Sequence, residues 1–292
     1  MSKGIIYLMG AGRSGTTALT TFLGNNSSIQ AIGEMHQFFE HIEHNKPCSC
    51  GALLGKCEFW SEILNYLPHD YLKNPKEYRA ICDTFEYHKA IPKYLFHAFK
   101  SEDLEKYCDI NEVVLNAVEK THTQSYIIDS AKYIGRALGL SKSKKINLKI
   151  IYVIRDVRGV IYSFSKKVQS SRTPLSTIMY WLVINGVAEI VYRFTPKDKI
   201  IKLKYEDLVE MPNRELERLE EFLDTDLSDI KGRIMHDEPF DMPHIIGGNR
   251  IKSNKQIHFK RDVSWKDDTS AFYRVAYYLL ASPIMLLNKF KI

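Results

Sequence analysis

The chain has 292 residues, 45% of them apolar and 26% charged, so it can bury a sizeable core in one large α/β domain or two small ones. Its 41 basic residues exceed its 35 acidic ones by six, a modest excess that suits anionic ligands. The cations are not gathered in aromatic-interleaved patches, which argues against a nucleic-acid-binding protein.

The first predicted element is a buried strand that runs into a glycine-rich loop. Residues 5 to 9 are apolar and uninterrupted, as expected of a strand covered on both faces, and a helical pattern follows over residues 18 to 23. The backbone N–H groups of residues 12 to 17 can therefore converge on an anion at the helix N-terminus. An ordinary tight turn is the alternative, but glycine-rich loops of this kind are strained unless they bind a ligand.

The loop differs from that of a nucleotide kinase in the position of its cation. Gly10 and Gly15 have the spacing of a P-loop, yet Thr16 stands where a kinase or an ATPase has lysine. The cation is instead Arg13, whose planar guanidinium can hold a terminal oxyanion without a metal. The loop by itself leaves a nucleoside triphosphate open as the ligand.

The run Gly-Arg-Ser-Gly-Thr-Thr resembles the phosphosulfate-binding loop of the sulfotransferases that use adenosine 3′-phosphate 5′-phosphosulfate (PAPS). In that family the sulfuryl group passes to an acceptor and 3′,5′-adenosine bisphosphate is the other product. The resemblance implies that Arg13 takes part in catalysis. It also implies that the 5′-phosphosulfate is bound by Gly12, Arg13, Ser14, Gly15, Thr16 and Thr17.

A general base is expected on the second strand, just beyond the loop, because the acceptor must lose a proton as it attacks sulfur. Residues 31 to 36 fit that position, and Glu34 matches the glutamate of the sulfotransferases that use a carboxylate base. His36, two residues along an extended segment, points to the same side and is the rival, since other sulfotransferases use histidine. Glu34 as a mere cap of the next helix is the remaining alternative.

Residues 40 to 125 match no motif of the family, and we expect a largely helical insertion that forms a lid and selects the acceptor. The insertion is rich in aromatic residues, which at helical spacing are more often core than ligand contacts. They include Tyr66, Tyr71, Tyr78, Phe85, Tyr87, Tyr94, Phe96 and Phe99.

Three cysteines lie close together at the start of this insertion. Cys48, Cys50 and Cys57 are interpreted as free thiols, with a loop-closing disulfide or a zinc site as alternatives. A tetrahedral zinc site would need a fourth ligand, for which His41 or His44 is the obvious candidate. We predict no metal site, and a reaction that requires no metal.

Two later strands end in candidate site residues. Residues 127 to 132 resemble the family's Asp-Ser-Ser-Lys or Asp-Lys-x-Pro segment, so Lys132 is a candidate second cation at the sulfuryl group, with a surface lysine as the alternative. Residues 146 to 154 predict a buried strand that leads into Arg155, and Ser163 follows on the next helix. This run resembles the segment with which sulfotransferases hold the 3′-phosphate of PAPS, although a capping and salt-bridging corner is the alternative.

The last motifs lie in the final third of the chain. Residues 200 to 204 predict a strand that runs into Tyr205-Glu-Asp-Leu, and a helix is expected over residues 212 to 223. Tyr-Glu-Asp-Leu at a strand end is typical of sulfotransferases, and the resemblance places Tyr205 near the nucleotide, with a buried structural tyrosine as the alternative. Residues 244 to 250 resemble the family's C-terminal loop over the nucleotide, so Arg250 is a candidate for 3′-phosphate binding.

The apolar stretch from Phe272 to Phe290 is interrupted by Arg274 and Pro283, so we expect an amphipathic helix packed on the domain, not a membrane anchor. The first strand follows directly on Met1-Ser-Lys, which predicts no secretory leader. We therefore expect a cytoplasmic protein with no transmembrane segment.

Together these motifs predict one three-layer α/β/α domain over residues 1–292, with a mostly parallel central sheet of about five strands. The expected activity is transfer of a sulfuryl group from PAPS to a hydroxyl or amine of a small-molecule, carbohydrate or lipid acceptor. A P-loop nucleotide kinase and a non-catalytic nucleotide-binding module are the alternatives. The sequence names neither the acceptor nor the oligomeric state.

Overall fold

The computed structural model describes residues 4–96, 98–166, 172–248, 250–260 and 262–292. Its centre is a five-stranded sheet in the order β2-β3-β1-β4-β5, and every neighbouring pair of strands is parallel. The predicted parallel sheet is therefore confirmed. The strands are β1 (Gly4–Gly10), β2 (Ile29–Gly33), β3 (Tyr126–Lys132), β4 (Asn147–Ile154) and β5 (Ile200–Lys204).

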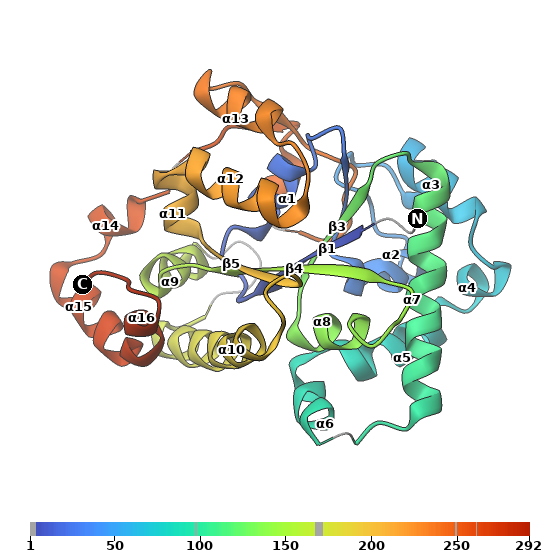
Figure 1. Cartoon of the computed structure of the whole chain (residues 1–292), viewed down its shortest axis with the longest axis horizontal. Coiled ribbons are helices and arrows are strands. Elements are labelled where there is room, and N and C mark those ends of the chain that lie inside the picture. Colours follow the sequence, from blue (N-terminus) through green and yellow to red (C-terminus); the bar gives the residue numbers. More distant parts are fainter. Residues whose placement is uncertain (1–3, 97, 167–171, 249, 261) are drawn as a thin grey trace.

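Helices cover both faces of the sheet, as the uninterrupted apolar strands require. Alternate side chains of β1 enter different cores: Tyr7 and Met9 pack on one face, and Ile6 and Leu8 on the other. The first face is covered by α8 (Ile134–Leu140), α9 (Val157–Ser165) and α10 (Pro174–Phe194). The second is covered by α1 (Thr16–Leu23), α11 (Tyr205–Glu210), α12 (Pro212–Leu223) and α13 (Ser228–Met235). Figure 1 shows α1, α12 and α13 above the sheet and α8 and α10 below it, so the predicted three layers are confirmed.

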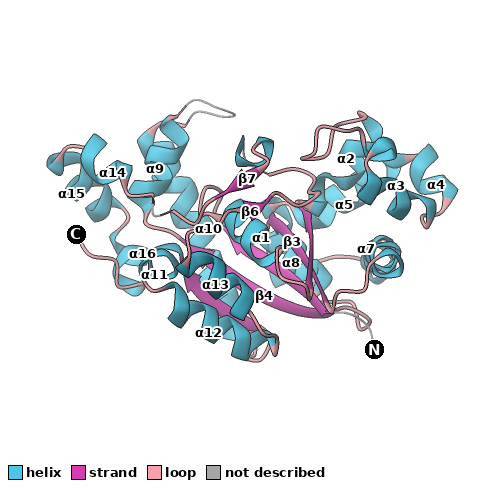
Figure 2. Ribbon diagram, turned by 90° about the horizontal axis from the view of Figure 1, so that it is seen from above, coloured by secondary structure: helices cyan, strands magenta, loops and turns pink. Residues whose placement is uncertain are grey.

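Helices fill the segment between β2 and β3, and Figure 2 shows α2 to α5 and α7 gathered at one end of the molecule. The short 3-10 helices in this segment are η1 (Met35–Gln37), η2 (Leu54–Lys56) and η3 (His88–Ala90). The α-helices are α2 (Phe38–Glu43), α3 (Glu58–Asn65), α4 (His69–Lys73), α5 (Pro75–Glu86), α6 (Ile91–Leu95) and α7 (Ser101–Thr121). The aromatic residues of this segment differ in burial: Phe85 is buried, whereas Phe96 is 81% exposed.

The C-terminal segment crosses the carboxyl edge of the sheet and ends beside α9. Its elements are β6 (Phe240–Asp241), η4 (Arg250–Ser253), β7 (Gln256–Ile257), α14 (Ser264–Asp268), α15 (Ala271–Leu280) and α16 (Ser282–Leu287). The single amphipathic helix predicted after Phe272 is wrong in one respect, because the chain forms two helices that divide at Ala281. Pro283 lies in the first turn of α16, where its missing N–H costs no hydrogen bond.

Within the described part of the chain, α10 is the helix whose length and apolar composition would allow it to span a membrane. Composition alone does not distinguish such a helix from a core helix. Ile178, Trp181, Ile184 and Ala188 of α10 are buried in the core below the sheet, whereas Met179 is 56% exposed. One side of α10 therefore packs against the domain.

The parallel arrangement brings five strand ends to one edge of the sheet. The residues that follow β1, β2, β4 and β5 and the last residue of β3 all lie at this carboxyl edge. Ligands of open α/β sheets bind there, so the fold places the predicted motifs where a shared site can form.

Candidate active site

A cleft of about 1160 Å³ opens at the carboxyl edge of the sheet. It is lined by the glycine-rich loop, the ends of β2, β3 and β4, and the segment between β6 and α14. Most of the predicted site residues reach it. Those that line the cleft are Gly12, Arg13, Gly15, Thr16, Thr17, Glu34, His36, Lys132, Arg155, Ser163 and Tyr205.

The loop between β1 and α1 places two residues, Arg13 and Gly15, at positive φ. Gly15 has φ of 89°, and a Cβ atom there would lie 2.6 Å from the ring of Tyr205. Arg13 has φ of 68°, and its guanidinium lies over the ring of Phe164 at 5.4 Å. Gly15 is the N-cap of α1 and has no side chain that could accept a hydrogen bond from the first N–H groups of the helix. They face the cleft that an anion would enter.

Ser14 and Gly12 of the loop differ from the simple expectation that both contact an anion in the cleft. Ser14 is fully buried, does not line the cleft, and its hydroxyl has no hydrogen-bond partner among the described residues. The N–H of Gly12 donates to the hydroxyl of Tyr180 at 2.8 Å, so a side chain from α10 already occupies this donor. No local sequence pattern indicates this contact, because 168 residues separate Tyr180 from Gly12.

Glu34 follows β2 directly and is buried at the cleft. Strand β2 ends at Gly33, whose φ of 84° turns the chain, so the predicted extension of this strand to residue 36 is wrong. The carboxylate of Glu34 forms an ion pair with Lys132 at the end of β3. Its second oxygen accepts a hydrogen bond from Gln37 Nε2 at 2.8 Å. Glu34 therefore presents a charged, oriented carboxylate to the cleft.

His36 lies in the 3-10 helix η1, not in an extended segment, yet it also lines the cleft. Its Nε2 lies 4.0 Å from Glu34 Oε2, and its ring packs edge-on against Tyr133. Burial lowers the pKa of His36 well below its usual value, and the charges of Lys132 and Arg136 lower it further. The imidazole is therefore neutral near pH 7, and neutral imidazole can accept a proton.

Arg155 lies at the end of β4 and is held from several sides. Its guanidinium is 3.2 Å from Asp262 Oδ2 and donates to the carbonyl of Arg13 at 3.2 Å. It also lies 4.3 Å from the centre of the Tyr205 ring, in a cation–π contact. Burial raises the pKa of Tyr205, so its phenol is protonated. One guanidinium thus joins the loop, the strand end and the Tyr-Glu-Asp-Leu segment.

Ser163 and Arg250 are the two remaining candidates for binding the 3′-phosphate. Ser163 lines the cleft from the last turn of α9, and Arg155 also lines it. Arg250 begins η4, but its side chain lies outside what the structure describes. Lys252 of the same short helix does line the cleft, and burial lowers the pKa of its ammonium.

Asp129, on β3, organises the edge that carries Glu34 and Lys132. Its carboxylate accepts hydrogen bonds from the N–H of Met35 at 3.3 Å and of Ala131 at 2.9 Å. Its second oxygen accepts from Arg136 Nε at 2.8 Å. Asp129 thereby fixes the residue after Glu34 and the residue before Lys132. An aspartate near the end of a buried strand was the only sequence signal for this role.

Gly247 and Gly248 of the C-terminal segment lie close to Glu34 and to Thr17 of the loop. A Cβ atom on Gly247 would lie 2.6 Å from Cβ of Glu34, and one on Gly248 would lie 3.6 Å from Thr17. Both glycines have positive φ, at 64° and 89°. The sequence motif at residues 244 to 250 thus contacts the candidate base and the loop together.

None of the eight aromatic residues named above for the insertion lines the cleft. His88 and Tyr133, which were not among them, do line it. Burial lowers the pKa of His88 to about 4, so this side chain is neutral at pH 7. The three clustered cysteines do not line the cleft either. The candidates named for a fourth ligand under the zinc alternative lie elsewhere: His41 bonds to Gln37 and His44 lies beside Glu43, whereas His244 lies with the cysteines.

Comparison with known proteins assigns the fold and site to a family. The model of the Sulfotransferase family matches residues 6–229, which include the loop, both strand-end cations and the Tyr-Glu-Asp-Leu segment. The chain belongs to the sulfotransferase family. No curated protein matches this sulfotransferase significantly in sequence.

Two solved structures share the sulfotransferase fold along its whole length. The sulfotransferase domain of the curacin biosynthetic pathway is 17% identical, with a TM-score of 0.58 over 100% of this chain and 99% of that one. The sulfotransferase domain of the Synechococcus PCC 7002 olefin synthase is 18% identical, with a TM-score of 0.57 over 100% of this chain and 97% of that one. The resemblance of this sulfotransferase to the family, first drawn from its loop, is confirmed.

Proposed function

We propose that this sulfotransferase transfers the sulfuryl group of PAPS to a hydroxyl or amine of a small-molecule, carbohydrate or lipid acceptor. The observation that carries the proposal is the Glu34–Lys132 ion pair, which lies in the same cleft as the glycine-rich loop. A carboxylate base and a fixed cation are the groups that sulfuryl transfer needs beside a bound donor. In this reaction the acceptor atom bonds to sulfur while the bond from sulfur to the bridging phosphate oxygen breaks.

The loop and Arg155 support the donor assignment. The N-terminus of α1, where the N-cap Gly15 has no side chain, suits the 5′-phosphosulfate together with Arg13, because both supply fixed positive charge without a metal. Arg155 and Ser163 suit the 3′-phosphate, and Tyr205 packs on the same guanidinium. The apolar lining residues Leu19, Phe22 and Phe259 can receive the adenine, and the rings of Phe22 and Phe259 lie 5.2 Å apart.

Glu34 is the proposed base. Its carboxylate is charged in the ion pair, so it can accept the acceptor's proton as the bond to sulfur forms. Lys132 is proposed to stabilise the charge on the sulfuryl oxygens and to restrain Glu34 until the acceptor enters. His36 is a neutral neighbour whose Nδ1 has no partner within the described part of the chain, so it is the alternative base.

The acceptor side favours a neutral hydroxyl. His36, His88 and Tyr133 line the cleft near Glu34, and the first two are uncharged near pH 7 because burial lowers their pKa values. The phenol of Tyr133 stays protonated because burial raises its pKa. Apart from the ion pair, these three side chains offer hydrogen bonds and aromatic surface without added charge.

The proposal is tested with PAPS radiolabelled on sulfur and a panel of hydroxyl and amine acceptors. Glu34→Gln is expected to lower kcat by about 10²- to 10⁴-fold, since it removes the base but keeps the shape. Binding of 3′,5′-adenosine bisphosphate should remain. A loss of the same size in His36→Asn with normal turnover in Glu34→Gln would transfer the role to His36. Unchanged activity or phenotype in both variants would favour a non-catalytic nucleotide-binding module.

A further inference from the structure

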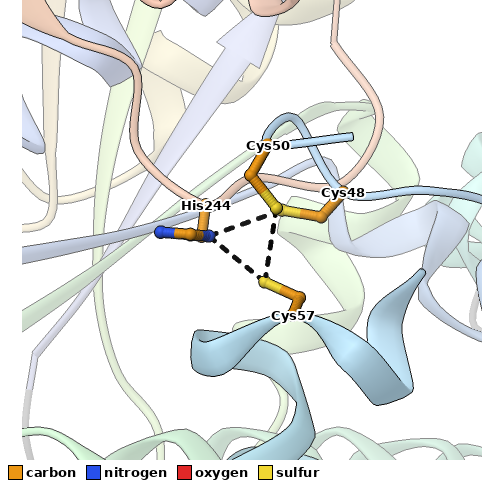
Figure 3. Close-up of side chains that lie close together, drawn as sticks. All are labelled: Cys48, Cys50, Cys57 and His244. Atoms are coloured by element: carbon orange, nitrogen blue, oxygen red, sulfur yellow. Dashed lines mark hydrogen bonds between the residues drawn. The ribbon is translucent and has the colours of Figure 1, made fainter. Parts of the chain in front are cut away.

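Figure 3 shows that four potential metal ligands converge, and none of them lines the cleft. Cys48 and Cys50 come from the loop after α2, Cys57 from the residue before α3, and His244 from the segment after β6. Their three sulfurs and one imidazole nitrogen all lie within 4.8 Å of one another. Two distant parts of the chain therefore meet at a set of three thiols and one imidazole.

Three of the separations within this cluster are close to the edges of a tetrahedral zinc site. Zinc bonds of about 2.3 Å to sulfur and about 2.05 Å to nitrogen imply edges of about 3.8 Å between sulfurs and about 3.6 Å between sulfur and nitrogen. Cys50 Sγ and Cys57 Sγ are 3.7 Å apart. His244 Nδ1 lies 3.2 Å from Cys57 Sγ and 3.9 Å from Cys48 Sγ. A disulfide would bring two sulfurs to about 2.05 Å, and all three cysteines are free thiols.

The local backbone holds the cysteines in this arrangement. Gly51, with φ of 87°, turns the loop, and its N–H donates to the carbonyl of Cys48 at 2.9 Å. The N–H of Cys48 donates in turn to the carbonyl of Ala52 at 2.9 Å. Cys57 is the N-cap of α3, so the start of this helix sets the position of its sulfur beside the loop.

His244 is fixed beside these cysteines by a separate set of contacts. Ser49 Oγ donates to the carbonyl of Pro243 at 2.6 Å and accepts from the N–H of Ile245 at 3.0 Å. The N–H of Ser49 donates to the carbonyl of Ile245 at 3.0 Å. The ring of His244 stacks on Phe59 at 5.9 Å. The residues on both sides of His244 are therefore bound to the cysteine loop, so its ring is aimed before any ion binds.

We propose that Cys48, Cys50, Cys57 and His244 bind one structural Zn²⁺. Thiolate and imidazole ligands select zinc over magnesium or calcium, and four protein ligands leave no position open for a substrate. The ion would join the start of the helical insertion to the segment that continues into Gly247 beside Glu34. This departs from the sequence prediction of no metal site, because that prediction had no means of finding His244. It leaves the predicted metal-free chemistry in the cleft unchanged.

The first test measures metal in the purified protein, grown with added zinc and handled with reductant. We expect about one zinc ion per chain. Replacement of the zinc by Co²⁺ should give the thiolate-to-cobalt charge-transfer band and the intense visible bands of tetrahedral cobalt. Protein that is zinc-free under these conditions and gives neither cobalt signal would overturn the proposal.

Variants then assign the ligands. Cys50→Ser changes an exposed side chain, so this variant should fold. Cys50→Ser and His244→Asn should each lose most of the bound zinc and have a lower Tm. Cys108→Ser, at an isolated and buried cysteine, is the control for zinc content and should keep its zinc, whereas His236→Asn, at an exposed histidine, should keep both the zinc and the Tm. Retention of full zinc by Cys50→Ser and His244→Asn would refute the assignment. None of these readouts depends on sulfuryl transfer, so they stand apart from the proposed activity.

Discussion

Glu34 and Lys132 form an ion pair across the carboxyl ends of β2 and β3, at the cleft that also holds the glycine-rich loop. Their backbones are fixed by one buried carboxylate, since Asp129 accepts from the N–H of Met35 and from that of Ala131. The pair is therefore an organised part of the sheet edge. A surface lysine, the alternative role for Lys132, would have no such partner at the cleft.

Lys132→Ala is expected to lower kcat by about 10²- to 10³-fold, because it removes a fixed cation at the position of developing negative charge. The affinity for 3′,5′-adenosine bisphosphate should change little, since this product lacks the sulfuryl group. Steady-state kinetics and calorimetry on the same preparation separate the two effects. An equal loss of bisphosphate affinity would place Lys132 at a phosphate instead.

Arg155→Ala is expected to raise KM for PAPS by about 10- to 100-fold, the effect of losing a charged hydrogen bond to phosphate. Asp262→Asn should act in the opposite direction, because the carboxylate that now pairs with Arg155 competes with the phosphate. Arg214→Ala, at an exposed arginine outside the cleft, is the control and should leave KM unchanged. An unchanged KM in Arg155→Ala would remove the 3′-phosphate assignment.

Gly15→Ala is expected to destabilise the protein by roughly 1–2 kcal/mol or more and to weaken nucleotide binding, because φ is 89° and the added Cβ meets the Tyr205 ring. Gly186→Ala is the matched control in α10, where the new Cβ meets nothing within 4 Å. That substitution should stabilise the protein by about 0.5–1 kcal/mol. Urea unfolding of both variants tests this contrast, and equal effects would argue against the described loop conformation.

The stability of the protein should fall as the pH drops through the histidine range. Burial lowers the folded-state pKa of His88 to about 4, so between about pH 4 and 6.5 the unfolded chain binds a proton that the folded chain does not. The free energy of unfolding therefore rises with pH across this window, by up to roughly 3 kcal/mol from this group. His36 contributes in the same direction because burial also lowers its pKa.

His88→Gln should make this pH dependence shallower, because glutamine does not titrate. His236→Gln, at an exposed histidine, is the control and should leave the slope as it is. Urea titrations between about pH 4.5 and about pH 7 measure the slope for each variant. An unchanged slope in His88→Gln would show that this side chain is solvated.

The parts of the site that the sequence predicts are those that one strand, loop and helix determine locally. Arg13, Arg155 and Tyr205 could be placed together because each follows a buried parallel strand, and such strands end at one edge. Glu34 reached the cleft as predicted although its strand ends early, because Gly33 turns the chain at the same edge. The order of these motifs along the chain was also sufficient to indicate the family that the comparison confirms.

The parts that could not be predicted are contacts between segments far apart in the chain. Asp262 is 107 residues from Arg155, and His244 is 187 residues from Cys57. A carboxylate or an imidazole in a loop carries no periodic pattern that indicates its partner. His41 and His44 are close to the cysteines in sequence, but they lie in or beside α2, where His41 contacts Gln37 and His44 contacts Glu43.

The most direct test of the account is a calorimetric titration of the purified protein with 3′,5′-adenosine bisphosphate, with 5′-AMP and ATP plus Mg²⁺ as comparisons. The bisphosphate and 5′-AMP differ in the 3′-phosphate that Arg155 and Ser163 are proposed to bind. We predict that the bisphosphate binds about 10- to 100-fold more tightly than 5′-AMP, and that Arg155→Ala abolishes the difference. Equal affinity for the two, or preference for ATP with Mg²⁺, would contradict a PAPS site in this cleft.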